Sequence, residues 1–232
     1  LFDDGPSRYS KLCSNFRHVT VCQIGLSTFK GVPHTNAYDV TSYNFFLRPH
    51  SSVSHDPTFV CQTTSIEFLQ KHNFDFNTWI YGGIPFMNSD DAEDLQRELV
   101  LIARGERVVT SSFEIRDQLS KVGSWAAFAE EGDSMEVDLQ TDYTARFLLK
   151  IMLSQRYDDL WTEGDLDKIL IKKMKPQERT KLQKEDPGFR NSIKKYIDSL
   201  LGFTLVFQEM AKHHKPLIFH NGLIDLMLLY KE

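Results

Sequence analysis

The sequence predicts an α/β fold, and three observations carry this prediction. Residues 19–47 are rich in β-branched and aromatic side chains, as in strands. Residues 189–230 show helical periodicity interrupted by a short apolar run, which is typical of helix, strand and helix in succession. The chain has 232 residues, of which 41% are hydrophobic and 25% charged. A chain of this length and composition can bury the core that layered helices and strands need.

The first third of the chain is expected to start with a β-hairpin. Residues 19–29 and 38–47 are two strand-like segments joined by a turn rich in Gly and Pro, so they should pair antiparallel. A short helix follows, for which Thr64 or Ser65 can provide the N-terminal cap. Residues 74–80 form another amphipathic turn before a pair of glycines.

The middle of the chain is predominantly helical in its pattern. Apolar side chains recur every three or four positions in residues 89–105, 113–129 and 144–156. The first of these begins with Ser-Asp-Asp, and acidic residues in a first turn suit the helix dipole. Residues 168–174 favour a strand. We therefore expect residues 89–187 to form an inserted subdomain, helical or α+β in character.

The C-terminal part is expected to return to the first layer. One long core helix is predicted over residues 189–213, and a proline ends it. Residues 217–219 should form a short buried strand, followed by a further helix over residues 224–230. Together with the first third, this part predicts a discontinuous α/β domain made of residues 1–88 and 188–232.

Charge is distributed unevenly along the chain. The formal net charge is −5, which argues against a protein that coats nucleic acid by bulk electrostatics. Residues 168–195 nevertheless contain ten basic and three acidic residues. This basic segment has two open interpretations, a solvated loop and helix face or a surface that guides a phosphate backbone.

Several classes of protein receive no support from local motifs. The chain has three thiols, Cys13, Cys22 and Cys61. They are odd in number and lack C-x-x-C spacing, so they support neither a disulfide framework nor a zinc ribbon, and a reducing compartment is expected. No apolar run reaches the ~20 residues of a membrane-spanning helix, and no signal segment opens the chain. The motifs of serine hydrolases, zincins and nucleotide-binding loops are absent from the sequence.

The strongest candidate for chemistry lies near the C-terminus. The predicted strand ends at His220 and Asn221, and the following helix places Asp225 one turn later. Ligands of α/β sheets collect at the carboxyl ends of strands. Asp225 can therefore be a metal ligand, or a carboxylate that the start of the helix stabilises.

Ordered blocks of sequence resemble the poly(A)-specific ribonuclease family, the deadenylase branch of the DEDD 3′-to-5′ exoribonucleases. Residues 216–230 resemble the H-N-x-x-x-D block of this family. Further similar blocks follow the family's order: residues 19–29, 43–47, 59–69, 74–77 and 83–88. Within the family, residues 125–135 and 160–173 are most similar to the branch that trims the 3′ ends of piRNAs.

The resemblance implies a fold and a site. The fold is a ribonuclease H-like mixed sheet with flanking helices, and four carboxylates hold two Mg²⁺ ions for phosphodiester hydrolysis. Asp225 matches the third acid of this set. The first two acids are expected before Leu1, and the histidine and fourth acid after Glu232, so the chain as given should not catalyse.

The resemblance also implies roles for other residues. Ile66 and Phe68 match apolar positions that wall the active site beside the terminal nucleotide. His220 and Asn221 match motif letters with a structural role at the site. In the basic segment, we expect an RNA-binding role for three lysines: Lys172, Lys173 and Lys175.

The leading hypothesis is an Mg²⁺-dependent 3′-to-5′ exoribonuclease that trims piRNA precursors in the germline. Alternatives are a poly(A) deadenylase of the same fold and a catalytically inactive RNA-binding relative. The expected partner is the 3′ end of single-stranded RNA, not DNA, and a protein scaffold of the piRNA pathway is a further candidate. A cytoplasmic location is expected. Attachment to the mitochondrial outer surface or the ER membrane would require a C-terminal segment beyond Glu232.

Overall fold

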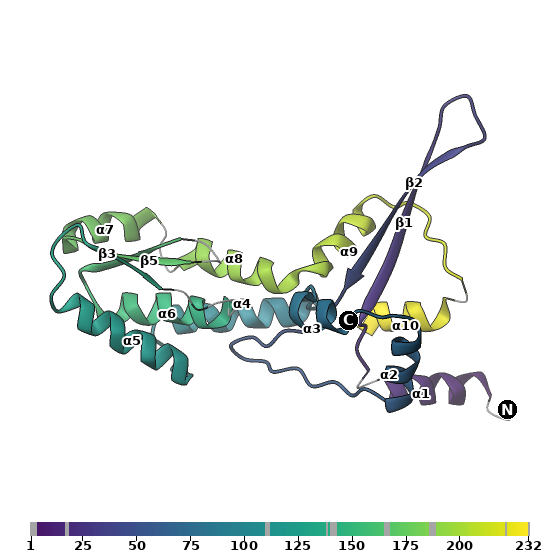
Figure 1. The fold of residues 1–232 in the computed structure, drawn as a ribbon, viewed down its shortest axis with the longest axis horizontal. Coiled ribbons are helices and arrows are strands. Elements are labelled where there is room, and N and C mark those ends of the chain that lie inside the picture. The colour runs from purple at the N-terminus through teal and green to yellow at the C-terminus, as the bar shows by residue number, and fades with distance from the viewer. Residues whose placement is uncertain are drawn as a thin grey trace. The chain divides into compact units, whose positions relative to one another are not determined.

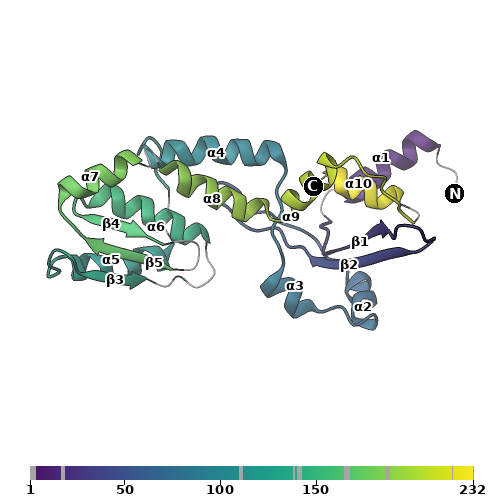
Figure 2. The ribbon, with the colours of Figure 1, turned by 90° about the horizontal axis from the view of Figure 1, so that it is seen from above.

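The computed structural model describes residues 4–16, 19–109, 112–137, 139, 143–164, 168–185, 189–220 and 222–231. The chain divides into two units (Figures 1 and 2). The first unit comprises Leu1–His50, Asp56–Asn88 and Leu201–Glu232, and the second comprises Ser51–His55 and Ser89–Leu200. No helix within the described ranges is both long enough and apolar enough to cross a bilayer.

The first unit contains the predicted hairpin. Strand β1 (Gln23–Gly31) pairs antiparallel with β2 (Tyr38–Phe46), with Gln23 opposite Phe46. The first strand begins at Gln23, four residues later than the sequence pattern indicates. Helix α1 (Gly5–Phe16) precedes the hairpin, although the sequence pattern did not indicate a helix there. The hairpin and the helices of both units confirm the α/β class.

Two short helices follow the hairpin. Helix α2 (Thr63–Lys71) begins one residue before the predicted caps, because Gln62 in extended conformation occupies the cap position and its carbonyl accepts the first amide bonds. In α3 (Phe76–Gly82), Asp75 caps the first turn by accepting the amide of Thr78. The buried indole of Trp79 donates to the carbonyl oxygen of Leu47 over 2.7 Å. This bond fixes α3 against the end of β2.

The long C-terminal helix predicted over residues 189–213 is broken in two. Helix α8 (Arg190–Leu201) and helix α9 (Phe203–Lys212) meet at Gly202, whose φ is +42°. The amide of Phe203 donates to the carbonyl oxygen of Pro85 over 2.9 Å, and a Cβ on Gly202 would collide with that oxygen. The carbonyl of Pro85 therefore takes the amide that would otherwise continue the helix. As a result α8 groups with the second unit and α9 with the first.

The short buried strand predicted over residues 217–219 is not formed. Leu217, Ile218 and Phe219 lie in irregular backbone and are 53%, 93% and 37% exposed. Among the described residues of this unit, the sheet consists of β1 and β2, which pair with each other, and the segment forms no ladder with either strand. The helix predicted after it is confirmed as α10 (Leu223–Lys231).

The second unit is α+β. Its sheet has the antiparallel order β3-β5-β4, built from β3 (Ser134–Val137), β4 (Leu160–Glu163) and β5 (Ile169–Lys173). The sequence pattern predicted β5 but neither β3 nor β4. The described residues of this unit also form helices α4 (Ser89–Ala103), α5 (Phe113–Ala126), α6 (Tyr143–Arg156) and α7 (Pro176–Glu185). The helices α4, α5 and α6 confirm the helical periodicity of the middle of the chain.

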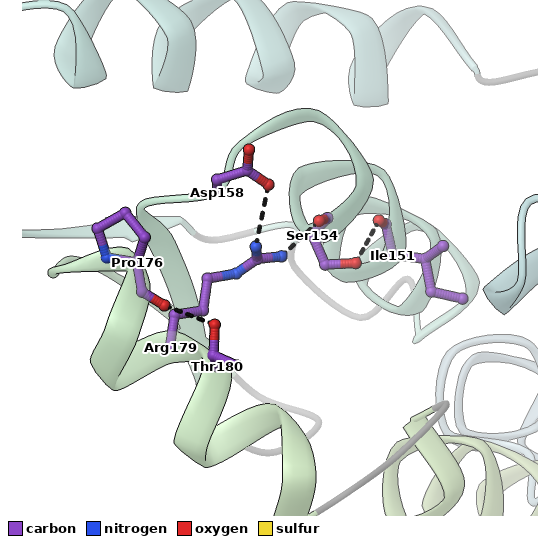
Figure 3. A network of polar contacts seen from close by, with 6 residues as sticks. All are labelled: Ile151, Ser154, Asp158, Pro176, Arg179 and Thr180. Atoms are coloured by element: carbon purple, nitrogen blue, oxygen red, sulfur yellow. Dashed lines mark hydrogen bonds and ion pairs between the residues drawn. The ribbon is translucent and has the colours of Figure 1, made fainter.

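The core of the second unit lies between α5, α6 and the sheet. Seven apolar side chains from these elements and α4 are at most 1% exposed: Leu99, Val122, Leu149, Ile151, Leu153, Ile169 and Ile171. Helix α7 is held by a polar contact instead (Figure 3). Its buried Arg179 donates to the carboxylate of Asp158 over 3.5 Å and to the carbonyl oxygen of Ser154 over 2.5 Å. The guanidinium thus ties α7 to the C-terminal end of α6.

Candidate functional site

An apolar groove in the first unit is a candidate site. Its volume is about 400 Å³, and it runs between the segment before β1, the segment before α2, and helices α2 and α3. Ile66, Phe68 and Trp79 are among its lining residues. The groove is within the size range of sites that take small molecules or single nucleotides.

Both apolar residues proposed to wall the active site lie at this groove. Ile66 is 41% exposed and Phe68 is 60% exposed, and none of the residues of α2 is buried. The ring of Phe68 contacts the ring of His72, with 4.4 Å between the centroids. The apolar side chains of α2 are therefore not explained by packing of the helix against a core. Exposed aromatic and aliphatic faces are suited to stacking on nucleic-acid bases.

Two thiols line the same groove, a feature that the sequence pattern did not indicate. Cys22 precedes β1 and Cys61 precedes α2. Burial raises the pKa of the Cys22 thiol, an effect that the backbone amide opposes and Cys61 reinforces. A raised pKa keeps the thiol neutral near pH 7, so Cys22 acts here as a small apolar wall and not as a nucleophile.

Asp225 lies in the first turn of α10, where its side chain is exposed. His220 precedes the helix and is also exposed, while Asn221 lies outside the described residues. Among the described residues, no group of three or more His, Cys, Asp or Glu side chains gathers closely enough to hold a metal ion. The described residues around Asp225 therefore do not make a complete Mg²⁺ site by themselves.

The three lysines of the basic segment lie in the second unit, and each is paired with a carboxylate. Lys172 contacts Glu163 at 2.6 Å, Lys173 contacts Asp159 at 2.7 Å, and Lys175 contacts Glu131 at 3.2 Å. Lys173 also donates to the carbonyl oxygen of Ala126 over 3.1 Å. Acidic residues from other parts of the unit thus offset these three positive charges, a feature that the local count of charges did not reveal.

Comparison with known families identifies the class of protein. The profile of the CAF1 family ribonucleases matches residues 1–232, so the chain belongs to the CAF1 ribonuclease family. This membership confirms the resemblance to the poly(A)-specific ribonucleases and the ribonuclease H-like fold class. Ribonucleases of this family generally use divalent metal ions.

Three relatives show which branches of the family this chain is similar to. Poly(A)-specific ribonuclease PNLDC1 of Mus musculus is 32% identical over 237 residues, covering 100% of this chain and 44% of that protein. The pre-piRNA 3′-exonuclease trimmer of Bombyx mori is 31% identical over 240 residues, with coverage of 100% and 44%. Poly(A)-specific ribonuclease PARN of Xenopus laevis is 24% identical over 265 residues, with coverage of 97% and 39%. The chain thus spans less than half the length of these relatives.

Proposed function

We propose that this chain is part of a 3′-to-5′ exoribonuclease that trims the 3′ ends of piRNA precursors. The observation that carries the proposal is similarity over the entire chain, at 31%, to a relative named as a pre-piRNA 3′-exonuclease trimmer. Membership of the CAF1 ribonuclease family supports the same class of reaction. A location in the cytoplasm and a scaffold protein of the piRNA pathway stay predictions.

In this proposal, the apolar groove receives the 3′-terminal part of the RNA. Phe68 and Ile66 offer apolar faces on which bases stack without regard to sequence. Such recognition suits an enzyme that removes successive nucleotides of different identity. Asp225 is proposed to supply one carboxylate to an Mg²⁺ site, because Mg²⁺ prefers carboxylate oxygens. In the complete site, Asp225 would help to hold a metal ion that supplies Lewis-acid chemistry for phosphodiester hydrolysis.

A poly(A) deadenylase of the same fold is the second candidate. PARN of Xenopus laevis is 24% identical over 97% of this chain, a lower identity than the 31% of the trimmer. The deadenylase is therefore less favoured than the trimming enzyme. A catalytically inactive RNA-binding relative is the third. The three candidate functions differ in which RNA is shortened faster and in whether any shortened products form.

The test uses the full-length protein that contains this chain and a 5′-labelled single-stranded RNA with a 3′ extension of mixed sequence. We expect a ladder of products that shorten by single nucleotides in Mg²⁺ and no products in EDTA. A matched oligoadenylate of the same length should be shortened no faster. Preference for oligoadenylate would favour the deadenylase. Binding of RNA without any shortening would contradict the proposal and favour the inactive relative.

A further inference from the structure

A small basic pocket lies in the second unit. Its volume is about 90 Å³. Three of its lining residues are cationic, Arg146 and Lys150 from α6 and Lys195 from α8. Ser192, in the first turn of α8, lines the same pocket. The positively charged groups therefore come from two helices and converge on one cavity.

Helical spacing explains why these side chains share the cavity. Arg146 and Lys150 are four residues apart in α6, and Ser192 and Lys195 are three apart in α8, so each pair lies on one helix face. The rings of Phe147 and Tyr196 stack between the two helices, with centroids 4.8 Å apart and planes 10° apart. This ring pair fixes the two cationic faces with respect to each other.

A second contact steadies the same pair of helices. The hydroxyls of Tyr196 and Thr144 are hydrogen-bonded at 2.7 Å. Tyr196 is only 1% exposed, and its ring lines the pocket as a rigid wall. The buried residues Phe147 and Tyr196 thus give the pocket one tightly packed wall.

The cations are held at the wall of the cavity. Arg146 is 5% exposed, and its guanidinium lies over the ring of Tyr143 at 5.7 Å from the centroid. The ammonium of Lys150 donates to the carbonyl oxygen of Gly164 over 2.6 Å. Gly164 has a φ of +100°, and a Cβ there would collide with the carbonyl oxygen of Lys168. The tight turn that presents this carbonyl therefore requires glycine.

We propose that the basic pocket binds one phosphate group. Burial of a guanidinium is costly unless anionic or polar groups compensate it, and a phosphate supplies both charge and several acceptor oxygens. Arg146, Lys150 and Lys195 also interact with other groups, so an incoming phosphate shares or exchanges partners with them. Ser192 and the backbone amides at the N-terminal end of the 12-residue helix α8 can donate further hydrogen bonds to phosphate oxygens.

The phosphate can come from an RNA backbone or from a free phosphate or nucleotide, and the same chemistry recognises each source. The proposal goes beyond the proposed trimming activity, because it concerns binding in the second unit and not hydrolysis. It is tested without turnover, so failure of trimming and failure of phosphate binding are separate results.

The test is calorimetric titration of the full-length protein with inorganic phosphate at constant ionic strength, in EDTA. Lys195→Gln removes one pocket charge, and Lys194→Gln is the matched control, since Lys194 is the exposed neighbour on the same helix and does not line the pocket. We expect saturable binding to the unmodified protein, about 10-fold weaker binding to Lys195→Gln, and unchanged binding to Lys194→Gln.

A second titration identifies the source. Competition of phosphate by a short oligoribonucleotide would assign the pocket to the RNA backbone, and competition by adenosine 5′-monophosphate alone would assign it to a nucleotide. Binding of inorganic phosphate alone would assign it to the free ion. Equal phosphate affinity of the two variants, or no saturable binding to the unmodified protein, would overturn the proposal.

Discussion

Arg48 and His50 hold each other through two hydrogen bonds of opposite direction. Nη2 of Arg48 donates to Nε2 of His50 over 2.9 Å, and Nδ1 of His50 donates to the carbonyl oxygen of Arg48 over 2.9 Å. A guanidinium only donates and a carbonyl only accepts, so the imidazole is neutral with its proton on Nδ1. Burial and the nearby charge of Arg48 lower the pKa of His50, although its bond to the carbonyl opposes them.

Stability should therefore depend on pH through His50. The unfolded chain has a histidine pKa of about 6.5, and the folded value is lower, so between the two values the unfolded state binds more protons. The contribution of His50 to the free energy of unfolding is complete above about pH 6.5 and is lost as pH falls through the folded pKa. His50→Gln should shrink the loss of stability between pH 7.5 and pH 5, measured by urea denaturation. His55→Gln, at an exposed histidine, is the control, and an equal loss in both variants would contradict the prediction.

Gly202→Ala should destabilise the protein by about 2–4 kcal/mol, because the methyl group is strained at a φ of +42° and meets the carbonyl oxygen of Pro85. The control is Gly25→Ala, where a Cβ has no atom within 4 Å, and it should change stability by less than about 0.5 kcal/mol. Chemical denaturation measures both variants. Equal stability of the two would show that α8 and α9 do not need glycine at their junction.

Phe68→Ala should weaken RNA binding at the apolar groove. Loss of one stacking face costs about 1–3 kcal/mol per base, which corresponds to a rise of at least about 5-fold in the dissociation constant. Stability should change little because Phe68 is 60% exposed. Fluorescence anisotropy with a labelled oligoribonucleotide in EDTA measures the effect. Phe113→Ala, 79% exposed in the second unit, is the matched control, and equal affinities would exclude Phe68 from the interface.

The basic segment is tested by the salt dependence of binding. Lys172→Gln with Lys175→Gln should lower the slope of log affinity against log salt by about 1.4, at roughly 0.7 for each phosphate contact with single strands. Lys173 is left intact because it bridges Asp159 and the carbonyl oxygen of Ala126. The control pair is Lys30→Gln with Lys212→Gln in the first unit. An unchanged slope would mean that the ion pairs with Glu163 and Glu131 persist when RNA binds.

Asp225→Asn should abolish trimming while folding is preserved. Asparagine keeps the shape and the hydrogen-bonding capacity of the side chain but removes the charge that would hold a metal ion. Because Asp225 is exposed, the melting temperature should change little, whereas single-turnover trimming by the full-length protein should fall by about 100-fold or more. Asp198→Asn, at an exposed carboxylate of α8, is the control. Near-normal trimming with a lowered melting temperature would assign Asp225 to the start of the helix alone.

The sequence predicted elements whose determinants are local. β-branched and aromatic content together with a turn rich in Gly and Pro located the hairpin. A period of three to four residues located helices α4, α5 and α6, since that pattern repeats over 14 or 15 residues in each. The break at Gly202 could not be foreseen, because the carbonyl that causes it belongs to Pro85, far away in the sequence. Strands β3 and β4 have only four residues each, too few for a periodic signal.

Among the candidate site residues, too, local features could be predicted from the sequence, whereas features that depend on tertiary packing could not. The apolar run at residues 217–219 indicates strand propensity but not whether the segment pairs with another strand in the folded protein. Ile66 and Phe68 were reached through family resemblance, while the contribution of Cys22 to the same groove depends on tertiary packing. The basic pocket assembles Arg146, Lys150 and Lys195 from separate helices, a juxtaposition that no local motif encodes.

The hydroxyl of Thr204 accepts from the amide of Met87 over 3.1 Å and donates to its carbonyl oxygen over 2.8 Å, and Phe86 forms a bridge with Gly202. The chain leaves the first unit just after Met87 and returns just before Gly202. These bonds therefore join the two ends of the loop formed by the residues between them. The entropy of closing a loop grows only logarithmically, by about 0.6 kcal/mol for each doubling of its length. A change in the length of residues 89–200 should therefore alter the stability of the first unit only slightly. Evolution can insert, delete or exchange residues in this stretch while the first unit keeps its fold.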